Sequence, residues 1–407
     1  MKILIAHNRY QQPGGEDAVV KTEFNLLKDF GEEVRLYERT NDEINDYSLV
    51  RKIDFLWNMG WSTNSYDDIR RVLKEFSPEV VHFHNIFFTI TPSVYQACRD
   101  EGVPVVQSLH NFRPLCSNGL FFRGGETCEK CMKKNFWYGV YYGCFKNSRV
   151  ATVFIARMLA RHWRAGTWTN MIDVFMTATK FTKDKYVQGG IPAEKIMIKP
   201  NFLYPFPEPE ISPDRKKNGY ALYVGRLSEE KGVDVLLSAW KFLTGIPLRV
   251  LGDGPLLEKL RKYAQENHIS NIEFLGYVSS QEYEINMKGA KVLIVPSRCY
   301  ENFPRIIAEA YAYGLPVVAS QLGSLAEIVE DGRTGYLFTP GDTNDLALKV
   351  GKIMSDEDGL SRMSAAARRV FEEKYGPQRN YQSLMAIYQK AINVSRKVAR
   401  VFEKDDA

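Results

Sequence analysis

A regular alternation of strand patterns and helical patterns runs along the whole chain and constrains its fold more than any other feature. Short apolar, β-branched runs that end at Gly, Pro or Asn predict strands, and the stretches between them with apolar residues every third or fourth position predict helices. The expected strands cover residues 2–6, 33–37, 80–84, 104–109, 174–177 and 195–199, then 220–224, 247–251, 272–275, 292–295, 317–320 and 335–338. Such alternation predicts α/β architecture, in which helices cover both faces of parallel sheets.

A proline-rich segment separates the two series of strands. Residues 204–213 contain four prolines in ten positions, a composition typical of a stiff, exposed linker. We therefore expect two doubly wound, Rossmann-like domains, 1–203 and 218–376, joined by a linker at 204–217. Ligands of open parallel sheets bind beyond the carboxyl ends of the strands. Two such domains that face each other across a cleft would suit a transfer between two substrates.

The last segment, residues 377–407, is expected to return to the first domain as a helix. Its apolar residues recur at helical spacing, and the segment is long enough to pack on that domain. These residues are Tyr381, Leu384, Tyr388, Ile392 and Val398.

Composition narrows the class of protein. The 407 residues are 44% hydrophobic and 25% charged with a formal charge of +5, which is ordinary for a soluble globular protein and does not by itself indicate nucleic-acid binding. The first residues lead directly into a strand, without the pattern of a signal peptide, and no apolar stretch has the length of a membrane span. We expect a cytoplasmic protein whose six cysteines are thiols or metal ligands rather than disulfides.

Two glutamates eight positions apart, Glu301 and Glu309, are the most informative candidate site residues. The expected strand before them ends at Pro296, and the expected helix after Pro304 ends at Gly314. Glu301 would therefore lie in a loop and Glu309 about two turns further on. Free amides near a helix start, here those of Asn302 and Phe303, bind anions. Together these groups would grip a ligand that carries hydroxyls and phosphate.

Turns at three neighbouring strand ends supply further candidates. Arg226 and Lys231 flank the turn that follows residues 220–224, where two cations would hold a diphosphate and neutralise the charge that develops on it as it leaves. The glycine turn Gly252-Asp253-Gly254 would let a ligand approach the backbone. Gly276 and Val278, at another strand end, would present backbone groups to a base edge; each turn is also compatible with a purely structural role.

The first domain offers a glycine loop and a group of histidines. Gly14 and Gly15 precede a helix and provide free amides, although they lack the spacing of a dinucleotide fingerprint. Three histidines lie at two strand ends, where side chains face the cleft in this architecture, and a structural role for each is the alternative. They are His82, His84 and His110.

Taken together, these motifs resemble family 4 of the glycosyltransferases, the retaining enzymes of GT-B fold. The resemblance covers nearly the whole chain and is most specific in its second half. The segments that carry it are residues 225–232, the stretch from Glu301 to Glu309, and the trailing elements 309–320 and 323–337. One departure is E-N-F-P at 301–304 in place of the commoner E-G-F-G, which changes the backbone freedom beside the sugar.

The resemblance implies a role for each matched residue. Glu309 would bind the ribose hydroxyls, Glu301 the donor sugar, and Arg226 with Lys231 the diphosphate. His110 matches the family's active-site histidine near the donor sugar and is expected to be catalytic together with Glu301, Arg226 and Lys231. Further residues are expected to complete the donor-binding site; they are Gly15, Gly276, Val278, Asn302, Phe303 and Pro304. The activity implied is transfer of a sugar from a nucleotide diphosphate sugar to a glycan or lipid-linked glycan acceptor, for a cell-surface polysaccharide or related glycoconjugate. It would need no cofactor for catalysis, because cations of the protein serve the diphosphate.

Four cysteines, which we call the cysteine cluster, follow the pattern C-x11-C-x2-C-x12-C. They are Cys116, Cys128, Cys131 and Cys144. The close pair with two flanking cysteines fits a tetrahedral structural zinc site. Free thiols are the alternative.

A basic, aromatic insert occupies about residues 113–172. Between residues 130 and 172 there are eight Lys or Arg and no Asp or Glu, with aromatic residues interleaved. This composition suits peripheral contact with the inner face of an anionic membrane, or docking of a lipid-linked diphosphate acceptor. The third interpretation is a cationic helix packed on the core by its aromatic residues.

Two further functions remain open at this point. A nucleotide-sugar epimerase could share the two-domain fold, and would release free epimerised donor. A zinc-containing nucleic-acid-binding protein built around the cysteine cluster would bind RNA or DNA in a salt-sensitive manner, but no other feature supports nucleic acid as a partner.

Overall fold

The computed structural model describes residues 1–11, 14–206 and 219–405, and the side chains of residues 49, 53 and 398–405 lie outside the description. Most of the expected linker at 204–217 therefore lies outside the described residues, as does the side chain of Val398 in the terminal helix. The chain forms two compact units. Unit 1 comprises Met1–Phe121, Glu129–Tyr204 and Pro377–Ala407, and unit 2 comprises Phe122–Cys128 and Pro205–Gly376.

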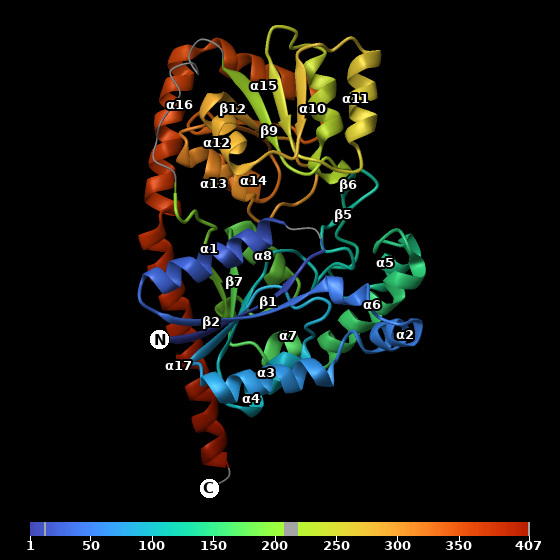
Figure 1. Cartoon of the computed structure of the whole chain (residues 1–407), viewed down its shortest axis with the longest axis vertical. Helices are drawn as coiled ribbons and strands as arrows, with labels where there is room; N and C mark the ends of the chain where they lie inside the picture. Colours follow the sequence, from blue (N-terminus) through green and yellow to red (C-terminus); the bar gives the residue numbers. More distant parts are fainter. Residues whose placement is uncertain (12–13, 207–218, 406–407) are drawn as a thin grey trace. The chain divides into compact units, whose positions relative to one another are not determined.

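Unit 1 is built on a parallel six-stranded sheet in the order β2-β1-β3-β4-β7-β8. Strands β1, β2 and β7 of this sheet are labelled in Figure 1. Its strands are β1 (Lys2–Arg9), β2 (Glu33–Thr40), β3 (Val80–Phe83), β4 (Val105–Ser108), β7 (Val174–Thr177) and β8 (Ile196–Ile198). All six were predicted from the sequence, and the structure confirms them with small shifts at their ends.

The helices of unit 1 cover both faces of this sheet. On one face, α1 (Gly15–Asp29) and α17 (Pro377–Asp405) enclose a core that includes Ile3, Leu27 and Leu384. The remaining helices are η1 (Asn41–Ile44), α2 (Leu49–Asn58), α3 (Thr63–Phe76), α4 (Ser93–Asp100), α5 (Trp137–Tyr142), α6 (Arg149–Arg164), α7 (Thr167–Asn170), α8 (Lys180–Gln188) and η2 (Ala193–Lys195).

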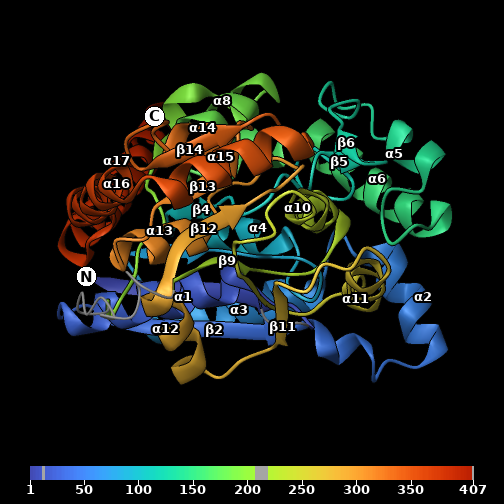
Figure 2. The ribbon, with the colours of Figure 1, turned by 90° about the horizontal axis from the view of Figure 1, so that it is seen from above.

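Unit 2 contains the second parallel sheet, in the order β11-β10-β9-β12-β13-β14. The strand labels of Figure 2 follow this order from β11 to β14. Its strands are β9 (Tyr220–Val224), β10 (Leu248–Leu251), β11 (Ile272–Gly276), β12 (Ala290–Val295), β13 (Val317–Ser320) and β14 (Gly335–Phe338). A short hairpin of β5 (Phe122–Arg123) and β6 (Glu126–Thr127) groups with unit 2, whereas the sequence placed these residues in an insert of the first domain.

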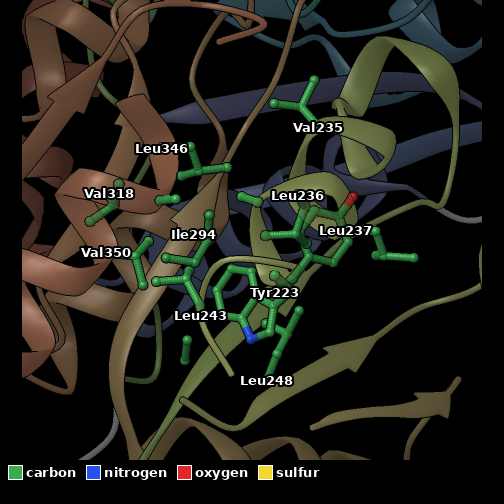
Figure 3. Close-up of a cluster of buried hydrophobic side chains, with 14 of the residues drawn as sticks. Tyr223, Val235, Leu236, Leu237, Leu243, Leu248, Ile294, Val318, Leu346 and Val350 are labelled. Carbon is green, nitrogen blue, oxygen red and sulfur yellow. The ribbon is translucent and has the colours of Figure 1, made fainter. Parts of the chain in front are cut away.

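Alternate residues of the unit 2 strands point to opposite faces, and both faces are buried, as expected for a parallel sheet. Tyr223 and Ile294 face a core shared with helices on one side (Figure 3), while Leu222 and Leu293 are buried on the other. The helices are η3 (Glu229–Lys231), α10 (Val233–Trp240), α11 (Leu257–Glu266), α12 (Ser280–Gly289), α13 (Arg305–Ala312), α14 (Ser324–Ile328), α15 (Thr343–Ser355), α16 (Glu357–Val370) and η4 (Phe371–Tyr375).

Strand order locates the expected ligand crevice in each unit. In doubly wound sheets, ligands bind outside the carboxyl ends of the two strands at which the winding direction reverses. This switch point lies between β9 and β12 in unit 2, and between β1 and β3 in unit 1. The loops that follow these four strands are therefore where site residues should gather.

Candidate functional site

The switch point of unit 2 brings Lys231 and Glu301 into direct contact. Lys231 ends η3, which follows β9, and Glu301 lies in the loop that follows β12. The Lys231 Nζ donates a hydrogen bond of 2.6 Å to Glu301 Oε1, and the Ser297 Oγ donates one of 2.7 Å to the same oxygen. The two side chains of the ion pair are 31% and 13% exposed. The cation and the carboxylate that the sequence suggested separately thus form one hydrogen-bonded pair.

Both members of this pair are held in their charged forms. Burial opposes ionisation of Glu301, but the Lys231 ammonium and the hydrogen bonds from Lys231 and Ser297 outweigh it and keep the pKa of this carboxyl below its usual range. Burial likewise disfavours the ammonium, and the charge of Glu301 more than compensates, so the pKa of Lys231 lies above its usual range. Arg226, which is separated from the end of β9 by Gly225, is exposed.

Glycines allow the loops of this site to approach each other closely. Gly232 has φ +68°, and a Cβ atom there would lie 1.9 Å from the carbonyl oxygen of Pro296, the residue that follows β12. Gly252 has φ +131°, and a Cβ atom would lie 2.0 Å from the carbonyl oxygen of Gly225. Larger residues would force these loops apart. The glycine turns of the sequence motifs therefore pack against protein backbone, and this packing places Lys231 beside Glu301.

Glu309 lies on α13 with its carboxylate held from two sides. The Tyr283 hydroxyl of α12 donates a hydrogen bond to Glu309 Oε2, and the Arg305 Nε lies 2.9 Å from Glu309 Oε1. The Glu309 side chain is 18% exposed. A carboxylate that is held in this way and partly exposed can accept hydrogen bonds from ligand hydroxyls without a large loss of side-chain entropy.

In the segment between Glu301 and Glu309, the backbone is available to a ligand and a side chain packs into the core. Helix α13 starts at Arg305, and Pro304 precedes it without a side-chain cap, so Asn302 and Phe303 lie just before the helix as the sequence predicted. The Phe303 ring is buried and contacts the ring of Tyr375 at 5.3 Å between centroids. Only the backbone of Phe303 can therefore serve a ligand.

Gly276 ends β11 and Val278 follows it, at the edge of the unit 2 sheet rather than at its switch point. The carbonyl of Gly276 accepts a hydrogen bond of 2.7 Å from the Gly252 amide. Tyr277, between the two predicted residues, is 91% exposed. A role for this turn in binding a base stays a prediction.

In unit 1, two of the three predicted histidines form a pair. His84 follows β3, His110 follows β4, and the distance between His84 Nδ1 and His110 Nε2 is 2.9 Å. Both line a cavity of about 30 Å³. His82 instead faces the interior, where it is hydrogen-bonded to Ser108 and to Tyr388. Burial lowers the pKa of His110 to about 3, so the ring is neutral at pH 7.

The Gly14–Gly15 loop starts α1, but one of its amides is already used. The Gly14 N–H donates to Asp17 Oδ2 at 2.7 Å, and Asp17 Oδ1 lies 2.9 Å from His7 Nε2. Gly15 is exposed, with open space around its Cα. Sequence reasoning missed Glu16, the next residue, which lines the same cavity as His110. Its place directly after two glycines at a helix start was the available signal.

The environment of Glu16 favours its protonated form. Burial raises the pKa of this carboxyl to about 8, although the hydrogen bond from Tyr10 and the charge of Arg113 act in the opposite direction. Arg113 also lines the cavity. Unit 1 therefore places a neutral imidazole and a carboxyl that titrates near physiological pH at the carboxyl end of its sheet.

The cysteine cluster is divided between the units, since Cys128 groups with unit 2 and the other three with unit 1. None of these four cysteines forms a disulfide. Burial raises the pKa of Cys131 to about 11, although the amides of Gly139 and Ser117 hydrogen-bond to its sulfur. Among the described residues, the set whose ligand atoms lie within 4.8 Å of one another is Glu23, His82 and His84. Zinc binding by the cysteine cluster stays a prediction.

Aromatic residues of the insert serve two purposes. Phe136 and Trp168 are buried in the core of unit 1, as the packing interpretation requires. Trp137 and Tyr141 are 60% and 68% exposed on α5. In the part of the chain that the structure describes, no helix is long and apolar enough to cross a membrane.

Each half of the chain matches a known family of glycosyltransferases. Residues 14–204 match the family model described as "Glycosyltransferase Family 4", and residues 207–370 match the family model described as "Glycosyl transferases group 1". A curated relative is the uncharacterized glycosyltransferase MJ1178 of Methanocaldococcus jannaschii, which is 29% identical over 205 residues, 50% of this chain and 57% of the relative. The chain spans 57% of the length of this relative, and 30% and 37% of the lengths of two other curated relatives.

Two solved structures share the fold over almost the whole chain. The lipopolysaccharide outer core galactosyltransferase WaaB, in its apo form, has a TM-score of 0.63 at 19% identity, covering 99% of this chain and 100% of that one. The Anabaena protein Alr3699/HepE, in complex with UDP-glucose, has a TM-score of 0.63 at 17% identity, with the same coverage. The expected GT-B fold is confirmed. Because each half of its sequence matches one of these two family models, the chain belongs to the family 4 glycosyltransferases.

Proposed function

We propose that the protein is a retaining glycosyltransferase that moves a hexosyl group from a nucleoside diphosphate sugar to an acceptor hydroxyl. The observation that carries this proposal is the Lys231–Glu301 pair at the switch point of unit 2. A charged lysine in the segment that follows β9, with Arg226 exposed nearby in the chain, suits a diphosphate.

Each residue of the site would bind a different part of the donor. Arg226 and Lys231 bind the diphosphate and stabilise the charge that grows on the leaving phosphate. Glu301 orients Lys231 and accepts a hydrogen bond from a sugar hydroxyl through its remaining lone pairs. Glu309, held by Tyr283 and Arg305, accepts hydrogen bonds from the ribose hydroxyls. The amides of Asn302 and Phe303, before Pro304, lie on the same loop as Glu301.

The chemistry needs no metal ion in this scheme. The bond between the anomeric carbon and the phosphate oxygen breaks, and the acceptor oxygen bonds to that carbon from the same face. The acceptor proton goes to the departing phosphate oxygen. In unit 1, Gly15 and His110 are the candidates for contact with the donor, and Glu16 is the candidate for contact with the acceptor, because it lines the cavity with His110.

The acceptor class is proposed from similarity and composition. One similar structure is a lipopolysaccharide outer core galactosyltransferase, which supports a cell-surface glycan as acceptor. The exposed aromatic residues of the basic insert support a lipid-linked acceptor or peripheral contact with the inner face of the cell membrane. The donor nucleotide is proposed to be UDP, because the Anabaena structure holds UDP-glucose.

A screen of UDP-, GDP- and ADP-sugars by thermal shift tests the proposal. At least one should stabilise the wild type and not the Glu309→Ala variant. The binding sugar is then incubated with glycan acceptors, and NMR of the product should show the donor's anomeric configuration. Absence of stabilisation by every nucleotide sugar would refute the proposal, and release of free epimerised donor would assign an epimerase instead.

A further inference from the structure

A buried ion pair lies behind the histidine pair of unit 1. Glu23, on α1, and Lys199, which follows β8, are 0% and 1% exposed, and Glu23 Oε1 lies 2.9 Å from Lys199 Nζ. Removing two charges from water is costly, and well-packed apolar residues often serve stability as well or better. The pair therefore calls for an explanation other than stability.

The same carboxylate faces two imidazoles. Glu23 Oε2 lies 3.6 Å from His82 Nδ1 and 3.5 Å from His84 Nε2. The ligand atoms of these three residues lie within 4.8 Å of one another, which raises the question of a metal ion. The Lys199 ammonium already supplies the cation at Glu23, and the Tyr388 hydroxyl is within 2.9 Å of His82 Nδ1. A metal ion would have to displace both, so the geometry favours a network of hydrogen bonds.

The contact between His84 and His110 requires a definite choice of protons. The 2.9 Å distance joins His84 Nδ1 to His110 Nε2, so one nitrogen must donate and the other accept. Both rings are neutral, because burial lowers the pKa of each below its usual range. Each ring thus carries one proton, and the location of the proton on His84 decides its location on His110.

The negative charge of Glu23 decides which ring nitrogen of His84 carries the proton. His84 Nε2 is buried and has no hydrogen-bond partner within ordinary distance among the described residues, and the group it faces is the Glu23 carboxylate. A carboxylate attracts an N–H group and repels a lone pair. His84 therefore carries its proton on Nε2 and accepts at Nδ1. His110 must then donate from Nε2, which leaves its Nδ1 as an acceptor.

We propose that Glu23 is a positioning residue that fixes His110 in the Nε2–H tautomer through His84. Lys199 balances the charge of Glu23, so the histidines stay neutral beside a buried carboxylate. His110 lines the cavity of unit 1, and in this tautomer it accepts a hydrogen bond from a hydroxyl group rather than donating one. This last step rests on the proposed function, in which His110 contacts a sugar; the tautomer itself does not.

The test reads the histidine protons directly. Nitrogen-15 NMR of histidine-labelled protein distinguishes the ring nitrogen that carries a proton from the one that does not, and loss of a signal in His110→Asn assigns His110. The wild type should show His110 protonated on Nε2. A wild-type His110 that carries its proton on Nδ1 would overturn the proposal, whatever the variants do.

Two variants then test the role of Glu23. Glu23→Gln removes the charge but leaves the Lys199 ammonium buried without a counter-ion, so it is expected to be unstable. Glu23→Gln with Lys199→Met removes both charges, and the Nδ1–H form of His110 should become populated in it. The control is Glu32→Gln, which alters another ion-paired carboxylate of unit 1 and should leave the His110 signals unchanged. Unchanged His110 signals in the double variant would refute the role of Glu23.

Measurements of transferase activity distinguish the positioning role of Glu23 from the proposed function of the protein. If sugar transfer is observed, the double variant should lose about tenfold or more in kcat, as is typical when a residue that orients a histidine is removed, with the KM for donor less affected. If no transfer is found but the NMR results hold, the proposed function fails and the positioning role stands. A variant that loses thermal stability without a change of His110 tautomer indicates a structural role only.

Discussion

Lys231 and Glu301 contact each other across two loops that are 70 residues apart in the chain, through a hydrogen bond of 2.6 Å. The contact depends on Gly232, whose missing side chain leaves room for the carbonyl of Pro296. In the free protein this cation and this carboxylate neutralise each other. When a ligand carries both phosphate and hydroxyl groups, the cation can bind the phosphate and the carboxylate can bind a hydroxyl.

Replacing Lys231 with alanine should lower kcat/KM for the nucleotide sugar by about 100-fold or more, the usual loss when a group that stabilises developing charge is removed. Steady-state kinetics with the donor found by the screen measure the loss. Lys262→Ala, which removes an exposed lysine on α11, is the matched control and should keep wild-type kinetics. Equal activity of the two variants would exclude Lys231 from the site.

Replacing Glu309 with alanine should weaken UDP binding by about 10-fold or more, the value of hydrogen bonds to a charged group. Calorimetry with UDP and with 2′-deoxy-UDP locates the effect. The wild type should prefer UDP, and Glu309→Ala should bind the two ligands more equally. A variant that keeps the full preference for the ribose hydroxyl would show that Glu309 does not contact it.

Glu16 should make the protein less stable as the pH rises from about 5 to 8. The carboxyl ionises near pH 4.5 when unfolded and near 8 when folded, so in this window the folded chain binds one more proton than the unfolded chain. Stability falls with pH wherever the folded state binds more protons. Urea unfolding across this range should therefore show Glu16→Gln gaining stability relative to wild type, with the difference constant above pH 8. Parallel curves for the two proteins would contradict the burial of Glu16.

We propose that the cysteine cluster binds one structural zinc ion per chain. Burial raises the pKa of Cys116, although the amides of Phe121, Asn118 and Gly119 donate hydrogen bonds to its sulfur and act in the opposite direction. Elemental analysis of purified protein should find zinc in the wild type and in Cys98→Ala, whose thiol lies outside the cluster, but not in Cys131→Ser. A chelator should lower the melting temperature. Wild-type protein without metal, and insensitive to the chelator, would leave the cysteines as thiols.

The exposed aromatic residues of α5 should bring the protein to anionic membranes. Co-sedimentation with phosphatidylglycerol vesicles should exceed that with phosphatidylcholine vesicles, because the insert is basic. Trp137→Ala with Tyr141→Ala should reduce binding severalfold. Tyr277→Ala, which removes an even more exposed aromatic side chain on unit 2, should not. If the wild type ignores both vesicle types, the insert has no membrane role, and a soluble acceptor becomes the alternative.

The sequence predicted the elements and the loops because both have local signals. Runs such as Val292–Val295 are β-branched and apolar, and strand ends are marked by Gly225 and Pro296. What it missed depends on contacts between distant segments. Nothing near Glu23 indicates Lys199, 176 residues later, and nothing near Glu309 indicates Tyr283. The contact between Lys231 and Glu301 was also not predicted from the sequence, because it depends on the space that a glycine leaves for another loop.

Helix α17 completes the core of unit 1 with Leu384, Ile387 and Tyr388, although it follows all of unit 2 in the sequence. During synthesis the sheet of unit 1 emerges first, yet the face that α17 covers stays open until more than 170 further residues have been made. Unit 2, which is nearly continuous in sequence, can fold before that. The half of the protein that is synthesised first is thus finished last, and ribosome-bound intermediates should expose the apolar face of unit 1 to chaperones.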